Sequence, residues 1–377
     1  MSGIYFHIPF CKKACHYCNF HFSTTTKLKD EVLNCISKEL KTRKNELNSE
    51  IRSIYFGGGT PSILSPEEIN KLIKQCRLHY NVSKDVEITL EANPEDLTSN
   101  KLDELVESEI NRLSIGVQSF QNVVLKWMNR SHDSDIAIRC IQNAQNKGFT
   151  NINLDLIYGL PEDLKRDWRV DIKKALALKV SHISAYNLTV EYKTVLAKWV
   201  KEKRCQMPSQ ESCKQDYDLL LKLLKKSNYE QYEISNFSLK GTRSRHNSSY
   251  WKTSPYLGIG PSAHSYDGKR IRKWNISNNS LYVKRISENK TAYKEEYLSD
   301  IDIANEEIIL GTRSMFGVSI NKVISCLSAD QQKIFHKQLK KLIEIKKVLI
   351  KEDRIYVNSE SKFLTDYIAR ELFILSS

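Results

Sequence analysis

Apolar and polar residues follow two different periods along the first half of the chain. Short runs rich in β-branched and aromatic residues, each bounded by turn residues, predict strands at residues 3–8, 52–56, 86–91, 112–117, 152–157 and 181–188. Between them, apolar positions recur every three or four residues and predict helices over residues 27–47, 66–79, 98–108, 133–147 and 163–178. Serine or threonine before a helical segment, and glycine after one, are recognised boundary signals.

Six strands that alternate with helices predict an α/β fold. Repeated strand–helix units imply a parallel sheet covered by helices, and because eight units would close a barrel, six predict a partial (β/α)6 TIM-like barrel. The second half is less regular: we expect a helix over residues 210–228, a strand over residues 229–235 and a loop region over residues 241–285. From about residue 300, the order helix, helix, strand pair, helix predicts a mainly helical, winged-helix-like C-terminal domain.

We therefore expect a barrel domain over residues 1–235, a connecting region over residues 236–295 and a C-terminal domain over residues 296–377. The composition, with 40% hydrophobic and 27% charged residues, is that of an ordinary globular protein. The sequence shows neither a signal peptide nor an apolar run approaching the ~18 residues of a membrane span. We expect a soluble, cytoplasmic protein without a transmembrane segment, and a monomer or dimer.

The charge and the cysteine count exclude two classes of protein. The net charge is +13, but the lysines are spread over helical faces among acidic or apolar residues, so no nucleic-acid partner is predicted. The nine cysteines are an odd number, which argues against a disulfide framework. Six of them are dispersed along the chain and are most simply small buried apolar residues.

The other three cysteines, Cys11, Cys15 and Cys18, lie on one tight loop directly after the first predicted strand. Their spacing suits a single inorganic centre. A [4Fe-4S] cluster held by three thiolates leaves one iron open to an outside ligand, whereas zinc prefers four protein ligands. Since His7, His16 and His21 lie in or beside the loop, a zinc site with one histidine stays open as an alternative.

Polar residues and glycines follow the next four predicted strands where these strands end. GGGTP at residues 57–61 follows the second strand, Glu91 ends the third, Gln118 follows the fourth, and Asp155 lies in the fifth, with Arg130 in the segment after Gln118. Parallel α/β barrels place their sites at the carboxyl ends of the strands. A carboxylate suits a ribose diol or an ammonium group, and an arginine suits a carboxylate.

These segments, HIPFCKKACHYC, GGGTP, LEANPE, GVQSF and LDLIYGLP, resemble the radical S-adenosylmethionine superfamily, in the branch of the coproporphyrinogen dehydrogenase HemN and the HemW-type heme chaperones. The resemblance implies that Cys11, Cys15 and Cys18 hold a [4Fe-4S] cluster whose fourth iron binds S-adenosylmethionine. It also implies which residues contact S-adenosylmethionine: Tyr5, Gly58, Gly59, Thr60, Glu91, Gln118, Arg130 and Asp155. Tyr17 matches a position near a second such molecule in the dehydrogenase.

Two features favour the heme chaperones within this branch. The dehydrogenase has a fourth cysteine two positions after the third, where this chain has Phe20, and residues 246–251 read HNSSYW, which resembles the HNxxYW motif of HemW proteins. By that resemblance, His246 is the first candidate for the axial ligand of heme, with His264 as the second. Arg243, Arg245, Arg270 and Arg272 are candidates to pair with heme propionates.

The sequence thus predicts a heme carrier that passes heme to an acceptor, for which a respiratory membrane protein is the class expected. The enzymatic alternative is the oxidative decarboxylation of coproporphyrinogen III in porphyrin biosynthesis. A zinc-stabilised binding protein is the third alternative.

Overall fold

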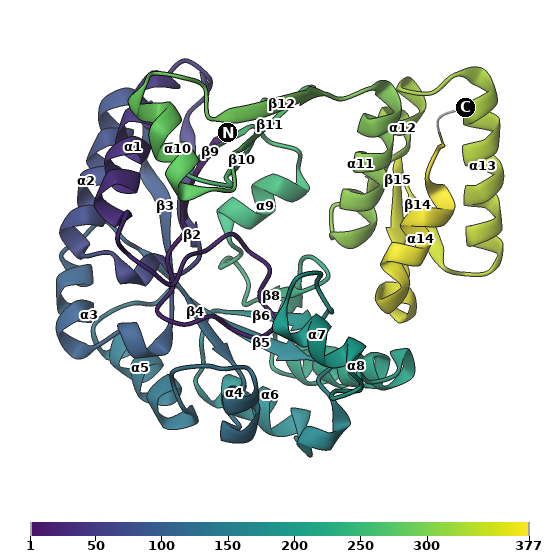
Figure 1. Ribbon diagram of the computed structural model, residues 1–377. Helices are drawn as coiled ribbons and strands as arrows, with labels where there is room; N and C mark the ends of the chain where they lie inside the picture. Colours follow the sequence, from purple (N-terminus) through teal and green to yellow (C-terminus); the bar gives the residue numbers. More distant parts are fainter. Residues whose placement is uncertain (1, 376–377) are drawn as a thin grey trace.

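The computed structural model describes residues 2–375. A twelve-stranded sheet runs through the larger part of the molecule in the order β12-β11-β10-β9-β1-β2-β3-β4-β5-β6-β8-β7 (Figure 1). Its strands are β1 (Ser2–Ile8), β2 (Ile51–Gly58), β3 (Val82–Ala92), β4 (Arg112–Gln118), β5 (Ile152–Tyr158), β6 (His182–Asn187), β7 (Glu230–Gln231), β8 (Asn236–Ser238), β9 (Tyr256–Ile259), β10 (His264–Tyr266), β11 (Ile271–Asn275) and β12 (Tyr293–Tyr297).

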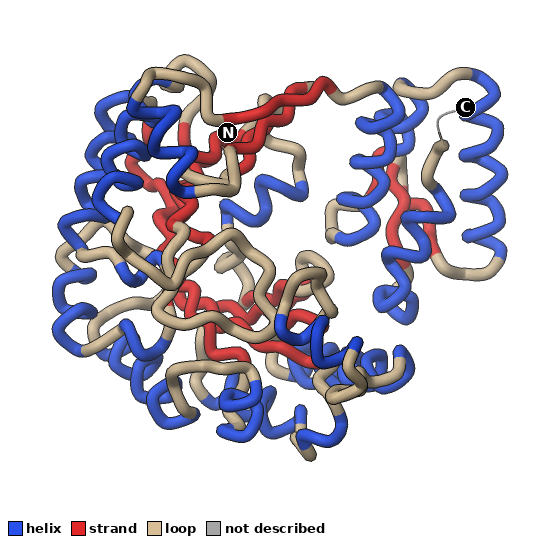
Figure 2. The backbone as a smooth tube through the Cα atoms, viewed as in Figure 1, coloured by secondary structure: helices blue, strands red, loops and turns tan. Residues whose placement is uncertain are grey.

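The six predicted strands form the centre of this sheet and are parallel, as expected. In the part of the chain that the structure describes, β12 and β7 do not pair with each other, so the barrel is open. The helices of this part are α1 (Lys29–Thr42), α2 (Pro66–His79), α3 (Ser99–Val106), α4 (Asn122–Trp127), α5 (Ser134–Asn146), α6 (Trp168–Ala177), α7 (Val195–Lys201), α8 (Gln210–Lys226), α9 (Arg245–Trp251) and α10 (Asn279–Ser287). They surround the sheet, mostly on its outer side, and α9 lies on the inner side against β1 and β2 (Figure 1 and Figure 2).

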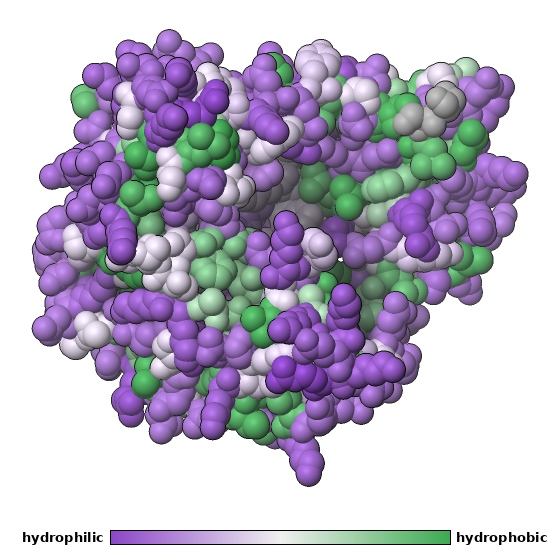
Figure 3. Space-filling view, in the orientation of Figure 1, coloured by the Kyte–Doolittle hydropathy of each residue, from purple (hydrophilic) through white to green (hydrophobic). Residues whose placement is uncertain are grey.

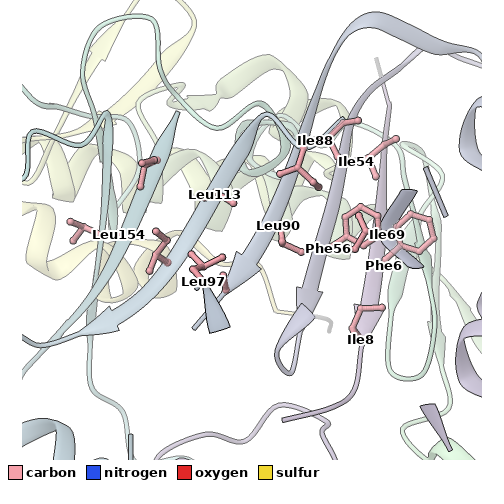
Figure 4. Close-up of a cluster of buried hydrophobic side chains, with 14 of the residues drawn as sticks. Phe6, Ile8, Ile54, Phe56, Ile69, Ile88, Leu90, Leu97, Leu113 and Leu154 are labelled. Carbon is pink, nitrogen blue, oxygen red and sulfur yellow. The ribbon is translucent and has the colours of Figure 1, made fainter. Parts of the chain in front are cut away.

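Local signals explain where the predicted helices begin. At α2, the Ser65 hydroxyl accepts a hydrogen bond from the Glu68 amide, the Glu68 carboxylate accepts one from the Ser65 amide, and Pro66 fills the first helical position. Apolar residues that alternate along the strands meet the inner faces of these helices (Figure 4). Phe6, Ile54 and Leu90 are completely buried there. The core thus fixes the strand ends that carry the site.

The prediction of a loop region over residues 241–285 is wrong. These residues form α9, β9, β10, β11 and part of α10, and β9 pairs parallel with β1, which extends the sheet beyond the six predicted strands. The strand expected over residues 229–235 is reduced to the two residues of β7. Glu39 of α1 ties this extension to the barrel, since its buried carboxylate accepts bonds from Asn275 Nδ2 (2.8 Å) and the Tyr282 hydroxyl (2.7 Å).

The C-terminal part has a core and a sheet of its own. It comprises α11 (Asp300–Arg313), β13 (Val318–Ser319), α12 (Ile320–Ser325), α13 (Ala329–Glu344), β14 (Val348–Lys351), β15 (Arg354–Val357) and α14 (Thr365–Leu372). The predicted strand pair is β14–β15, and a separate apolar cluster that includes Phe335 and Leu372 fills this module. It lies beside the barrel, on the right in Figure 1. The domain boundaries at residues 235 and 295 stay predictions.

No helix between residues 2 and 375 has both the length and the apolar composition that crossing a bilayer requires.

Candidate functional site

The three cysteines of the loop after β1 line one cavity of about 530 Å³ at the carboxyl ends of the strands. The loop is anchored on both sides. The Cys11 amide donates to the Ser23 carbonyl (3.0 Å), and Asn129 Nδ2, which follows α4, donates to the Ala14 carbonyl (2.7 Å). The thiols therefore face the cavity from a loop that the barrel holds in place.

The glycine segment after β2 packs directly against this loop. The Gly59 amide donates to the Ile8 carbonyl (2.9 Å), and the Thr60 amide donates to the Phe10 carbonyl (2.7 Å). A Cβ atom on Gly59 would lie 2.7 Å from the Phe10 carbonyl oxygen, which is too close for any side chain. A glycine at position 59 is therefore needed for the close approach of the two backbones.

Two of the thiols receive hydrogen bonds from the cavity wall. The Thr60 hydroxyl donates to Cys11 Sγ (3.3 Å), and Arg130 Nη1 donates to Cys15 Sγ (3.4 Å). Burial raises the pKa of Cys11 to about 11, so this thiol keeps its proton at neutral pH in the ligand-free protein. The donors are thus placed to stabilise sulfur atoms that lose their protons on binding a metal.

Arg130 is held in the cavity by Asn93, which the sequence analysis missed. Arg130 Nη2 donates to Asn93 Oδ1 (2.6 Å) and to the Gly116 carbonyl (2.7 Å), whereas Arg130 Nε is buried and has no partner among the described residues. An unpaired buried donor is costly unless a ligand satisfies it. The LEANPE segment that marked Glu91 also contains Asn93, and its place after a strand end was the available signal.

Two acidic residues, from β3 and β5 on either side of β4, line the same cavity. Burial, with the nearby charge of Asp155, raises the pKa of Glu91 to about 7, although the Tyr55 hydroxyl donates to Glu91 Oε1 (2.8 Å). Burial also raises the pKa of Asp155, which accepts a bond from Asn153 Nδ2 (2.8 Å). Carboxyl groups with raised pKa values in a cleft are typical of functional sites and suit a cationic or hydroxyl-bearing ligand.

The structure brings nearly all residues predicted to hold the cluster or S-adenosylmethionine together around this first cavity. Gln118 reaches it from a turn with φ +68°, a backbone conformation that side-chain-bearing residues rarely adopt. Tyr5 is the exception and lies on a different cavity. The first cavity is lined by Cys11, Cys15, Tyr17, Cys18, Gly58, Gly59, Thr60, Glu91, Gln118, Arg130 and Asp155, and also by residues that were not predicted, among them Lys13, Ser114, Tyr186 and Asn187.

A second cavity of about 620 Å³ adjoins the first. Asn19 and Phe20, which end the cysteine loop, line both cavities. The wall of the second is aromatic with polar groups at its edges, and the surface view is hollowed between the barrel and the C-terminal module (Figure 3). Its lining includes Tyr5, Tyr250, Tyr256 and Tyr266 together with His7, His21, His264, Arg272 and Glu306.

The two histidines proposed as heme ligands lie in different surroundings. His246 is only 1% exposed, and its ring nitrogens lie 2.9 Å from Ser53 Oγ and 2.8 Å from the Tyr250 hydroxyl. Burial, with a contribution from the charge of Arg112, lowers the pKa of His246 to about 3, so the ring is neutral. His264 begins β10, is exposed and lines the second cavity. His246 therefore packs behind the cavity wall, whereas His264 faces the cavity.

The three histidines near the cysteines do not line the first cavity. His7 and His21 face the second one, and His16 Nδ1 lies 2.7 Å from the Trp127 carbonyl oxygen. Among residues 2–375, no three His, Cys, Asp or Glu side chains converge on one point as a single metal ion requires. A zinc site needs four such donors around one ion, whereas a cluster binds each thiolate through a separate iron. The three thiols that line the first cavity suit the separate irons of a cluster.

Comparison with known proteins agrees with this geometry. Residues 5–175 match the model of the radical SAM superfamily. The chain is 34% identical to the heme chaperone HemW of Bacillus subtilis over 97% of each chain. The chain belongs to the HemW family of the radical SAM superfamily. It is also 33% identical to the heme chaperone HemW of Lactococcus lactis, over 97% of this chain and 98% of the relative.

The HemW-family chain shares its fold with the coproporphyrinogen III oxidase HemN of Escherichia coli. The TM-score is 0.83 over 98% of this chain and 89% of HemN, with 24% sequence identity. This likeness confirms the predicted partial barrel with its C-terminal module. Membership of the superfamily implies a [4Fe-4S] cluster and S-adenosylmethionine. The residues that hold them in this chain are a separate question.

Proposed function

We propose that this chain is a heme carrier with two adjoining sites. In the first cavity, Cys11, Cys15 and Cys18 hold a [4Fe-4S] cluster, and the neighbouring wall binds S-adenosylmethionine. In the second cavity, the tyrosines cover the faces of heme. The observation that carries the proposal is the shared wall of Asn19 and Phe20, which sets an aromatic cavity of sufficient size beside a three-thiol cavity.

In the first cavity, each group on the wall has a role that its chemistry supports. The cluster supplies an open iron coordination position, and the chain supplies the rest. Arg130, with its unpaired Nε, suits the carboxylate of S-adenosylmethionine, and Glu91 and Asp155 suit its ammonium group or its ribose diol. Thr60 and Arg130 stabilise the thiolates through the hydrogen bonds to Cys11 and Cys15.

In the second cavity, His264 is the candidate ligand of heme iron. The other two histidines of its wall are engaged by polar groups, since His7 Nε2 lies 2.9 Å from the His21 carbonyl oxygen and His21 Nε2 lies 2.7 Å from Asn279 Oδ1. A neutral imidazole is the usual protein ligand. Partial desolvation at the cavity wall, with the charge of Arg272, lowers the pKa of His264, which favours that form.

His246, the first candidate from the sequence, would have to give up its contact with Tyr250 to reach the cavity. We propose that it positions the Tyr250 hydroxyl on the cavity wall. Relatives named heme chaperones support delivery to an acceptor protein, for which a respiratory membrane protein remains the expected class.

Anaerobic reconstitution tests the first site. Iron and sulfide analysis and electron paramagnetic resonance should show about four irons and four sulfides per chain. Cys18→Ser should lose the cluster signal, whereas Cys326→Ser, a free and partly exposed cysteine in the C-terminal module, should keep it. Tetrahedral zinc without labile sulfide would overturn the proposal.

Hemin titration tests the second site. His264→Ala should weaken binding by about tenfold and change the Soret band, because an iron–imidazole bond is lost. His246→Ala should leave the band position unchanged, because its ring does not reach the cavity. A band shift with His246→Ala alone would make His246 the ligand, and turnover of coproporphyrinogen III to a decarboxylated product would favour the enzymatic alternative.

A further inference from the structure

One arginine lines the second cavity among the residues that the structure describes. Arg272 of β11 lies on its wall, and its guanidinium carbon is 5.7 Å from the centre of the Tyr266 ring. The other three arginines near the candidate heme ligands are engaged elsewhere, in the pairs Arg243 with Glu230, Arg245 with Asp85 and Arg270 with Asp300. A ligand that enters this cavity with a carboxylate therefore meets Arg272.

Arg272 already has a partner from the C-terminal module. Its Nη1 lies 2.7 Å from Glu306 Oε1 on α11, and Glu306 lines the same cavity. A second carboxylate, Glu296, lies further off at 3.9 Å. The Arg272 and Glu306 side chains are 30% and 23% exposed, so a ligand can reach both. The ion pair thus closes one edge of the cavity and joins β11 to α11.

We propose that Glu306 competes with the ligand's carboxylate for Arg272, so that loading of the cavity breaks one of the links between α11 and β11. This inference rests on the proposed heme site. Glu306 already occupies Arg272 Nη1, and a second carboxylate brought beside it is repelled by its negative charge. A ligand carboxylate that pairs with Arg272 therefore displaces Glu306, and the C-terminal module loses one of its attachments to the barrel.

The chain offers a matched control for this ion pair. Arg270, directly before β11, pairs with Asp300, the first residue of α11, so this second pair joins the same two elements. Neither Arg270 nor Asp300 lines the second cavity. Asp300→Asn therefore removes a β11–α11 ion pair without changing the cavity, whereas Glu306→Gln removes the one that faces it.

Hemin titration of the full-length protein separates the two pairs. Glu306→Gln should bind hemin about tenfold more tightly, because Arg272 is freed, and Arg272→Met should bind it about tenfold more weakly. Asp300→Asn should change the affinity by less than about twofold, as expected of an exposed pair. The dimethyl ester of hemin, which lacks free carboxylates, should bind wild type and Glu306→Gln equally.

Hydrogen exchange gives a second readout. Hemin should speed the exchange of α11 amides in the wild type, and in Glu306→Gln this exchange should already be fast without hemin. Unchanged affinity in Glu306→Gln, or equal tightening for the ester, would overturn the competition while the heme site stands. A wild-type protein that binds no hemin would overturn both proposals.

Discussion

At the scale of single residues, Glu91 shows how the first cavity differs from an ordinary protein surface. Burial and the neighbouring Asp155 raise its pKa to about 7, from the value near 4.5 of a free glutamate. At pH 7 the neutral and the charged form of this carboxyl group are therefore about equally populated in the folded, ligand-free protein. Its charge becomes favourable only when a cationic group or a hydroxyl donor arrives.

Glu91→Gln should make the ligand-free protein more stable at alkaline pH. Because the folded-state pKa is raised, the contribution of Glu91 to stability is fully present below about pH 4.5 and is lost as the pH rises through about 7. We expect the variant to gain about 1–2 kcal/mol in the free energy of unfolding at pH 8.5 and almost nothing at pH 4.5. The gain at pH 8.5 is smaller than the full pKa shift would give, because the cavity is open to solvent, which screens the charge. Urea unfolding at both pH values measures the gain.

Glu31→Gln, on the exposed face of α1, is the matched control for this experiment and should behave as wild type at both pH values. A gain with Glu91→Gln that does not depend on pH would contradict the explanation. Glu91→Gln should also bind S-adenosylmethionine more weakly than the wild type does. Its stability and its affinity for this ligand therefore change in opposite directions.

Most residues of the first cavity could be predicted from the sequence because each follows a strand in a short motif. The cysteine loop after β1 and the GGGTP segment each span only a few consecutive residues. A parallel sheet places the carboxyl ends of all its strands at one edge, independently of the other contacts in the fold. The burial of His246 could not be predicted in this way. It depends on Ser53 of β2 and on Tyr5 of β1, which lie far away along the chain. The pairing of Arg272 with Glu306 is likewise set by how two modules pack.

At the scale of elements, β1 to β6 were predictable because they are buried and rich in β-branched residues. The missed strands β9 to β12 have three to five residues each, and β12 is mostly exposed. Short, half-exposed strands leave no clear period, and their pairing is fixed by the long-range contact of β9 with β1. Helix α9 is also short, and it begins where the Ser244 hydroxyl accepts a bond from the Asn247 amide.

The turn after β4 depends on one buried carboxylate of α6. Asp171 accepts hydrogen bonds from the Phe120 amide (2.6 Å), the Ser119 hydroxyl (3.0 Å) and Gln121 Nε2 (2.8 Å). These bonds hold the segment directly after Gln118, whose positive φ is unfavourable on its own. Asp171 is therefore a positioning residue for the first cavity.

Asp171→Asn should lower the free energy of unfolding by about 2–3 kcal/mol, because an amide group would face donors that need an acceptor. It should also weaken the binding of S-adenosylmethionine to the reconstituted protein, since Gln118 loses its fixed orientation. Calorimetry of ligand binding and urea unfolding measure the two effects. Asp135→Asn, in the exposed first turn of α5, should change neither, and full binding by Asp171→Asn would refute the positioning role.

At the scale of the whole molecule, the barrel and the C-terminal module have separate apolar cores. Hydrogen bonds between their backbones and side chains join the two parts. The Met315 amide donates to the Tyr232 carbonyl (2.9 Å), the Ile234 amide donates to the Arg313 carbonyl (2.9 Å), and Lys362 Nζ donates to Gln231 Oε1 (2.7 Å). The module has its own apolar cluster and three-stranded sheet. It can therefore loosen from the barrel without losing its internal packing.

Native-state hydrogen exchange should show this division. We expect the amides of α11 to α14 to share an opening free energy that is lower than that of β1 to β6, because the module's core is smaller and its contacts with the barrel are few. Exchange measured at several low denaturant concentrations identifies the two groups. A single opening free energy for both parts would show that they unfold as one unit.

The position of Phe20 couples the shapes of the two cavities. The Phe20 side chain is 66% exposed, yet it lines both cavities. A rotation of this ring about its side-chain torsion angles changes the space in both cavities at once. A ligand that shifts the Phe20 ring in one cavity therefore changes the shape of the other cavity, without a rearrangement of the barrel.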